Sequence, residues 1–192
     1  MNDLVKHLSS YCEITAEDER ALIELALVKS FQKNQVLLKE GRLSKECFFV
    51  LKGSIRSYYI KDNEERTTDL FFEGDVVSPA CYGTTVASDY YLQCLEDTVA
   101  CVGTPELEAM AYEKCPSLER IGRLMADALL TKANRNMDLF KLSSPEERYQ
   151  NLFETRPEIL QRVNQYQIAS YLGIKAESLS RIKMRIHQKK VS

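Results

Sequence analysis

The hydrophobic pattern changes its period between residues 31 and 104, and this change limits the folds open to the chain. Short runs rich in β-branched and aromatic residues appear there, namely Gln35–Leu38, Cys47–Leu51, Ser54–Ile60, Thr67–Phe72 and Gln93–Val102. Between them stand the turn signals Glu40-Gly41, Lys52-Gly53, Asp62-Asn63 and Glu73-Gly74-Asp75. Many short strands joined by tight corners predict an antiparallel sandwich or β-roll, in which glycines supply the positive φ angles of the corners.

Segments on both sides of this region have helical spacing. Residues 1 to about 30 read as helical, with Thr15 and Asp18 spaced as in a capping box before an apolar face. Residues from about Pro105 to Leu142 are helical again, and Pro116 suits the first turn of a long helix. We therefore expect an α+β fold, with an antiparallel, jelly-roll-like β-roll flanked by helices.

The long helix, expected over about 116–142, carries an apolar stripe. Its members are three or four residues apart: Leu118, Ile121, Met125 and Ala128. Lys132 and Arg135 then interrupt the stripe before Leu139 restores it. Such a stripe fits contact with a second copy of the helix in a homodimer, and it also fits packing on the β-roll.

A strong helix start marks a boundary between two expected domains. Ser144 suits the N-cap, Pro145 the first helical position and Glu147 the position that completes a capping box. The helix should stop near Arg156-Pro157, because the residue before a proline avoids helical angles. We expect a β-roll domain over 1–142, which includes the long helix, and a small all-helical domain over 143–192.

The charge is distributed unevenly along the chain. The net charge is −2, but residues 161–192 contain seven cations against the single acid Glu177, so this end carries +6. The other 160 residues therefore carry −8. An acidic body with a basic end favours a polyanionic partner, although a solvated terminal helix would have the same composition.

Composition also bears on the compartment. No run approaches 18 consecutive apolar residues, and the first residues lack the pattern of a secretory signal. The six cysteines are scattered without a C-x-x-C pair, as expected of small buried hydrophobic residues in a reducing cytosol. We expect a cytoplasmic protein that does not enter a membrane.

Residues 163–186 have the spacing of a helix-turn-helix unit. Ala169 suits a close crossing of two helices, Gly173 four residues later suits a left-handed turn, and Leu179 follows six residues after that. Ile168, Leu172, Ile174 and Ile182 supply the inner face. Because other helical hairpins can share this pattern, the outer face of the second helix is needed to distinguish a DNA-binding unit from a structural hairpin.

That outer face carries side chains suited to DNA. They are Glu177, Ser178, Arg181, Lys183 and Arg185. An arginine can bind guanine with two hydrogen bonds, a glutamate accepts from the cytosine amino group, and flanking cations suit phosphates. We expect Glu177 and Arg181 to read bases, with Ser178, Lys183 and Arg185 positioning the helix on double-stranded DNA.

The whole chain resembles the cyclic-AMP-receptor/fumarate-nitrate-regulator (Crp/Fnr) family of bacterial transcription regulators. The segments that carry the resemblance are ITAEDERALIELA, FQKNQVLLKEG, CFFVLKGSIRSYYI, FFEGDVV, YEKCPSLERIGRLMADALL and QIASYLGIKAESLSRI. The resemblance implies a β-roll effector domain, a long helix that forms a homodimer, a C-terminal helix-turn-helix and RNA polymerase as a further partner. For that reason we favour the dimer for Leu118, Ile121 and Met125. Glu177 and Arg181 fall on the family's base-reading residues, whereas Ala176 replaces an arginine that is frequent there.

The resemblance is degenerate where the family binds cyclic AMP. Members that bind it use a Glu in a Gly-Glu-x-Leu segment and an Arg in an Arg-Ser/Thr/Ala segment, but these regions here read Val77-Ser78-Pro79-Ala80 and Asp89–Gln93. Since a buried phosphate without a cation is costly, we do not expect cyclic AMP as the effector. The side chains that could line a pocket for a less charged ligand are Ser78, Pro79, Tyr90, Tyr91 and Gln93. They could equally fill the core.

No cofactor is expected. An iron–sulfur cluster needs several N-terminal cysteines and only Cys12 is there, while the two histidines, His7 and His187, lie near the ends. A cupin-type metalloenzyme needs histidines on its strands, and residues 31–104 contain none, so we do not expect an enzyme. Few residues follow the recognition helix, so the wing should be abbreviated or absent. The alternative function is an effector-binding or protein-interaction module with a vestigial helix-turn-helix.

Overall fold

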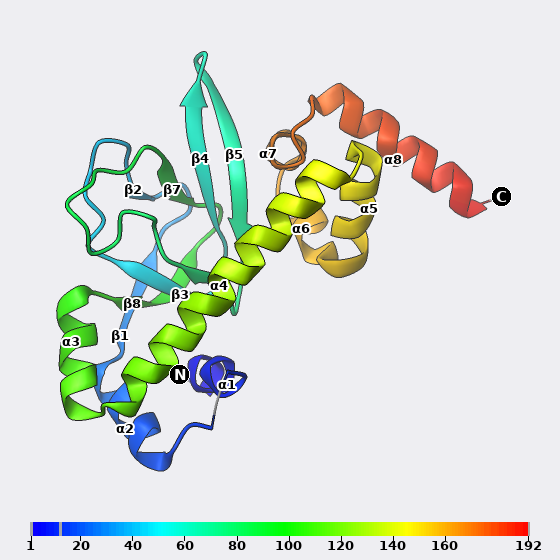
Figure 1. The fold of residues 1–192 in the computed structure, drawn as a ribbon. Coiled ribbons are helices and arrows are strands. Elements are labelled where there is room, and N and C mark those ends of the chain that lie inside the picture. The colour runs from blue at the N-terminus through cyan, green and yellow to red at the C-terminus, as the bar shows by residue number, and fades with distance from the viewer. Residues whose placement is uncertain (1, 12, 192) are drawn as a thin grey trace. The chain divides into compact units, whose positions relative to one another are not determined.

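The computed structural model describes residues 2–11 and 13–191, and it shows helices before and after a set of strands (Figure 1). The first helices are α1 (Asn2–Ser9) and α2 (Ala16–Leu25). The strands are β1 (Leu27–Phe31), β2 (Val36–Leu38), β3 (Cys47–Lys52), β4 (Ile55–Lys61), β5 (Glu64–Phe71), β6 (Val76–Val77), β7 (Tyr91–Cys94) and β8 (Thr98–Gly103). The later helices are α3 (Pro105–Lys114), α4 (Ser117–Leu142), α5 (Pro145–Thr155), α6 (Pro157–Arg162), α7 (Gln165–Tyr171) and α8 (Ala176–Val191).

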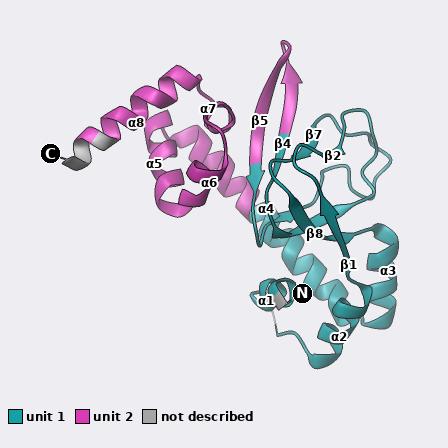
Figure 2. Cartoon of the chain, turned by 180° about the vertical axis from the view of Figure 1, so that it is seen from behind, with its two compact units in different colours: residues 1–57, 70–131 teal, residues 58–69, 132–192 magenta. Residues whose placement is uncertain are grey.

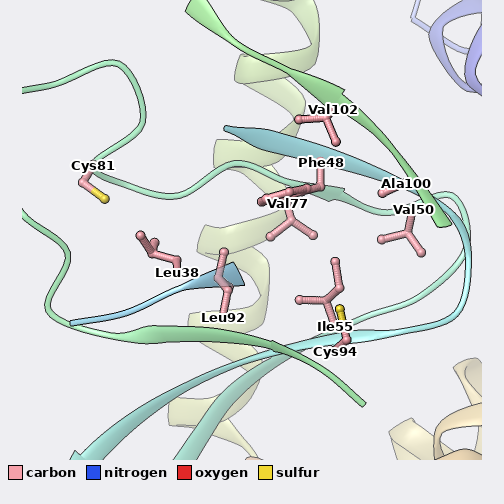
Figure 3. Close-up of a cluster of buried hydrophobic side chains, with 10 residues drawn as sticks. All are labelled: Leu38, Phe48, Val50, Ile55, Val77, Cys81, Leu92, Cys94, Ala100 and Val102. Carbon is pink, nitrogen blue, oxygen red and sulfur yellow. The ribbon is translucent and has the colours of Figure 1, made fainter. Parts of the chain in front are cut away.

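The strands form two four-stranded sheets, which confirms the expected β-roll. Sheet A has the order β1-β8-β3-β6 and sheet B the order β2-β7-β4-β5. In sheet A, β8 pairs antiparallel with both β1 and β3, so that Cys101 lies opposite Val28 on one side and Phe49 on the other. A core of buried aliphatic and aromatic side chains, among them the fully buried Val50 and Ile55, belongs to both sheets (Figure 3).

Gly53 shows why one corner of the roll needs a glycine. Its φ is +96°, and a Cβ there would lie 2.6 Å from Thr98 Oγ1 and 2.7 Å from the Asp97 carbonyl oxygen. Any other residue would meet both backbone strain and a clash with the neighbouring strand. The Lys52-Gly53 turn signal in the sequence therefore marks a position where the chain passes close to itself.

Three parts of the strand region differ from the sequence expectation. Residues 27–31, assigned to the first helical zone, form β1 instead, because their backbone pairs with β8. The run Gln93–Val102 is two strands, since the chain turns at 95–97 and Leu95 N donates to the Ser54 carbonyl oxygen at 2.9 Å. The short β6, which the sequence did not predict, pairs with β3.

Helices at the start and middle of the chain share a second apolar cluster. It comprises Leu8, Ala21, Cys115, Leu118 and Ile121. The capping box at Thr15 is confirmed, and its partner Asp18 is only 1% exposed. Burial alone would raise the pKa of Asp18, but hydrogen bonds from Cys115, Ser117 and Thr15 outweigh it and hold this pKa well below its usual range.

The cysteines within the described residues are free thiols. Cys81, Cys94 and Cys115 are buried, as expected of small hydrophobic residues, whereas Cys47 and Cys101 are half-buried. Cys12, the cysteine considered for a cluster, lies outside the described residues.

The chain divides into two compact units, which are described separately (Figure 2). Unit 1 comprises residues 1–57 and 70–131, and unit 2 comprises residues 58–69 and 132–192. α4 ends at Leu142 and α5 is capped by Ser144, whereas the compact units divide within α4, after residue 131, and unit 2 also contains residues 58–69. Among the described residues, no helix has the length and apolar character needed to cross a lipid bilayer.

Candidate nucleic-acid interface

The helices of unit 2 form a small bundle around an apolar core. α5 begins with the expected capping box, in which the Ser144 N–H donates to Glu147 Oε2 at 2.7 Å and the Glu147 N–H donates to Ser144 Oγ at 3.3 Å. The core side chains are Tyr149, Leu152, Ile159, Val163, Ile168, Ala169, Leu172, Leu179 and Ile182. Because Ala169 is fully buried between larger side chains, α7 and α8 can approach each other closely.

The turn between α7 and α8 is fixed by its backbone. α7 starts at the N-cap Asn164, whose side chain accepts from Gln167 N at 2.9 Å. At its end, Gly173 N donates to the Ser170 carbonyl oxygen and Ile174 N to that of Ala169, both at 2.9 Å, which is the Schellman arrangement. Gly173 has a φ of +70°, and a Cβ there would lie 2.9 Å from Phe140 Cζ. The expected glycine turn is confirmed, and it requires glycine for two independent reasons.

Arg148 connects this turn to the end of the long helix. Its Nη1 donates to the carbonyl oxygens of Phe140 at 3.0 Å and Ser143 at 2.7 Å, and its Nη2 donates to that of Leu172 at 3.0 Å. The guanidinium also lies over the Phe140 ring, 4.3 Å from its centroid. One side chain thus satisfies carbonyl groups where α4 and α7 end, a role that the sequence analysis missed because Arg148 belongs to no motif.

The exposed face of α8 carries the predicted base-reading residues. Glu177 and Arg181 are exposed and one turn apart, with exposed Met184 on the same face. Leu179 and Ile182 point the opposite way, into the core. The inner face of the helix therefore fixes the direction in which Glu177 and Arg181 project.

The three predicted positioning residues do not lie together. Ser178 and Arg185 lie on one flank of α8, where Arg185 Nη2 is 3.2 Å from Glu146 Oε2. Lys183 lies on the other flank, and its Nζ donates to Gln165 Oε1 at 2.5 Å. Partial burial lowers the pKa of Lys183. The cations thus flank the central pair on both sides, whereas the sequence analysis placed Lys183 on the same outer face as the others.

The helix residues chosen for a dimer are differently placed. Leu118 and Ile121 are each only 4% exposed, because α1, α2 and α3 of the same chain cover them, and Met125 packs against the same cluster. This is intramolecular packing, but on helices rather than on the β-roll that the sequence analysis considered. The exposed apolar side chains of α4 lie further along and include Leu130 and Met137.

The five predicted effector-pocket residues lie apart: Ser78 and Pro79 follow β6 of sheet A, and the other three fall on different sides of sheet B. Tyr90 packs against the core, and its hydroxyl accepts from Ala80 N at 3.1 Å, next to the Ser78-Pro79 segment. Tyr91 and Gln93 point away from the core, because Leu92 and Cys94 alternate with them and are buried in it. The five residues therefore do not converge on one cavity.

A buried cation that the sequence analysis missed lies beside Gln93. Arg56 in β4 is 3% exposed, and its Nε and Nη2 donate to Gln93 Oε1 at 3.1 and 2.6 Å. Its signal in the sequence was a single charge within the apolar run Ser54–Ile60. Gln93 is thus engaged by a protein side chain and by the Asn34 carbonyl oxygen, to which its Nε2 donates at 3.1 Å.

Comparisons with known proteins agree with this architecture. Residues 28–106 match the family model of the cyclic nucleotide-binding domain. The anaerobic regulatory protein of Haemophilus influenzae is 26% identical over 166 residues, which cover 80% of this chain and 64% of that protein. The fumarate and nitrate reduction regulatory protein of Vibrio cholerae is 26% identical over 176 residues, which cover 85% of this chain and 70% of that protein. The chain is thus similar to anaerobic and fumarate-nitrate regulatory proteins over most of its length.

Solved structures of similar fold extend beyond the β-roll. FixK2 from Bradyrhizobium japonicum has a TM-score of 0.67 at 19% identity, covering 86% of each chain. The c-di-GMP responsive regulator CLP of Xanthomonas campestris has a TM-score of 0.69 at 14% identity, covering 92% of this chain and 93% of that one. These likenesses show the fold of the chain. The chain spans about 64% of the length of the Haemophilus influenzae relative.

Proposed function

We propose that this protein is a sequence-specific transcription regulator of the Crp/Fnr type that places α8 in the major groove of double-stranded DNA. The observation that supports the proposal best is the exposed pair Glu177 and Arg181 on a helix whose inner face is anchored in the core. Base reading needs side chains held in a fixed direction, and a buried inner face provides this. The names of the relatives agree with a regulator rather than an enzyme.

In this proposal the charged side chains have separate tasks. Arg181 donates to guanine O6 and N7, and Glu177 accepts from a cytosine amino group. Ser178 and Arg185 contact the backbone on one flank of α8, while Lys183 and the neighbouring Gln165 approach it on the other. Arg185 can exchange Glu146 for a phosphate, because surface ion pairs contribute little to stability.

A homodimer is part of the proposal, with a changed contact surface. Leu130, Ala133 and Met137 follow one another at intervals of three and four residues on α4, and Leu130 and Met137 are 62% and 53% exposed. Apolar side chains at this spacing suit a two-helix seam with a second copy. Leu118 and Ile121, already covered within their own chain, would then support the helix rather than contact the partner.

The proposal also concerns the effector and the contact with the transcription machinery. Cyclic AMP is not the proposed effector, because Ser78-Pro79 offers no carboxylate and Asp89 stands in the segment where a cation is needed. RNA polymerase is the partner that a regulator of this kind would contact.

Salt-dependent retention on DNA distinguishes this function from the alternative module with a vestigial helix-turn-helix. A DNA-binding protein should be retained on duplex DNA at low salt and released as the salt concentration rises, since phosphate contacts displace counterions. A control in which Arg181, Lys183 and Arg185 are all replaced by Ala should be retained much less. Equal retention of the two proteins would favour the vestigial module.

A further inference from the structure

The two cations that flank the base-reading pair on α8 differ in the charge of their partners. Lys183 Nζ lies 2.5 Å from Gln165 Oε1, which belongs to a neutral amide, so this contact does not balance the positive charge. Arg185 Nη2 lies 3.2 Å from Glu146 Oε2, so a carboxylate balances the positive charge on the opposite flank. Of these two contacts, only that of Arg185 neutralises a charge.

Features other than Arg185 favour a negative charge at Glu146. This residue lies in the first turn of α5, where the N-terminal end of the helix stabilises an anion. The side chain of Glu146 is 27% exposed, whereas that of Arg185 is 58% exposed. Neighbouring Glu147 differs, because its carboxylate accepts from the Ser144 N–H in the capping box. Arg185 is therefore the member of the ion pair that can turn toward solvent, while Glu146 stays as an anion beside α8.

A DNA phosphate on this flank would compete with Glu146 for the same guanidinium group. If Arg185 turns to the phosphate, Glu146 loses its partner and lies close to the DNA backbone, where salt screens repulsion only beyond about 10 Å. If Arg185 stays with Glu146, this flank contributes no net positive charge. In both cases the flank binds DNA more weakly than an unpaired cation would, and the penalty does not depend on base sequence.

We propose that Glu146 lowers the affinity of the protein for the DNA backbone by competing with phosphate for Arg185. The inference rests on the proposed function, in which Arg185 faces the backbone. Because the penalty applies to every duplex alike, Glu146 leaves the preference among sequences unchanged. It lowers the overall affinity, so a duplex must also satisfy Glu177 and Arg181 in order to remain bound at physiological salt.

Titration of a labelled duplex of mixed sequence with the full chain, at several salt concentrations, tests the role of Glu146. At low salt, E146Q should bind this duplex about threefold to fivefold more tightly than wild type, the effect expected of a surface ion pair. Its salt slope should be steeper by up to about 0.9, the value for one additional phosphate contact. E154Q removes the same charge from the other end of α5, where Glu154 accepts from Gln150, and should bind like wild type. An E146Q protein with the affinity and salt slope of wild type, or an equal gain in E154Q, would overturn the proposal.

A double-mutant cycle locates the effect at Arg185. R185A should weaken binding several-fold more in E146Q than in wild type, because only E146Q leaves this cation fully available to a phosphate. K183A removes the cation on the opposite flank and should weaken binding by both proteins equally. Equal losses from R185A in the two backgrounds would overturn the proposal.

Two further outcomes separate this inference from folding defects and from the proposed function. If E146Q does not fold, the single variants R185A and K183A decide the matter, and a salt slope lowered as much by R185A as by K183A would overturn the proposal. A wild-type chain that is not retained on duplex DNA at low salt would contradict the proposed function, and this inference with it. A retained wild type without the E146Q effect would contradict this inference alone.

Discussion

At the scale of single residues, a few side chains perform tasks that no motif announces. Arg148 donates hydrogen bonds to backbone carbonyls where α4 and α7 end. Asp18 in α2 accepts hydrogen bonds from Thr15, the N-cap of this helix, from Cys115 between α3 and α4, and from Ser117 in α4. Capping boxes and the glycine turn could be predicted, because they depend on neighbours within a few residues. Arg56 and Arg148 could not, because their partners are chosen by tertiary contacts.

Asp18 should make the free energy of unfolding depend on pH in the acid range. Its pKa is depressed in the folded chain, so its contribution is fully present above the ordinary aspartate value of about 3.9 and is lost as the pH falls through the folded value. D18N should therefore lower the free energy of unfolding at pH 7 and flatten its dependence on pH below about 4. Urea unfolding at a series of pH values checks this, with the exposed E17Q as control. Equal acid dependence in D18N and wild type would contradict the account of this carboxyl.

Arg181 should determine base preference, whereas Lys183 should not. R181A should weaken binding to the preferred site by about 1–3 kcal/mol and relax the preference at one base pair. K183A should weaken binding to all sequences similarly and lower the salt slope, since it faces phosphates in the proposal. Titration of labelled duplexes at several salt concentrations separates the two effects, and an unchanged base preference in R181A would remove the assignment of this residue.

At the scale of elements, the period of the hydrophobic pattern predicted which segments form helices or strands better than it predicted what those elements pack against. Most strands of the roll and the helices α4, α5, α7 and α8 follow from spacing and caps. β1 and β6 do not, because pairing with β8 and with β3 decides their conformation. The stripe on α4 shows the same limit. Its first turns pack on the chain's own helices, and spacing alone cannot distinguish this packing from contact with a second copy.

The exposed part of α4 should hold the dimer together. L130E should shift the protein toward monomer, because it places a charge in an apolar seam between two helices. N136E introduces the same charge on another face of α4 and should leave the dimer intact. Sedimentation at tens of micromolar measures the mass of each protein. A wild-type monomer at this concentration, or an undiminished dimer in L130E, would contradict the proposed seam.

At the scale of the whole molecule, similarity to known regulators does not identify the effector. The match over 28–106 is to a domain described by its binding of cyclic nucleotides, yet Ser78-Pro79 and Asp89 do not provide the two groups that such a ligand needs. Arg56, a buried cation beside Gln93, donates two hydrogen bonds to the Gln93 side chain. Similarity to known proteins therefore indicates the architecture, while the residues of each site decide the ligand.

Cyclic nucleotides should leave the protein unchanged. We expect calorimetry to detect no binding of cyclic AMP or cyclic GMP up to about 1 mM, which corresponds to less than about 4 kcal/mol. Thermal unfolding with either nucleotide should give the same midpoint as the free protein. Micromolar affinity for either one would mean that other residues supply a phosphate site.

Selection of bound duplexes from a random DNA pool, with sequencing of the retained fraction, tests the central claim most directly. A homodimer that reads DNA with two copies of α8 should enrich a two-fold symmetric sequence whose half-sites lie about one helical turn apart. The enriched sequence should contain a G·C pair in each half-site for Arg181. Failure to enrich any sequence over the starting pool at low salt would contradict the account of this chain as a DNA-reading regulator.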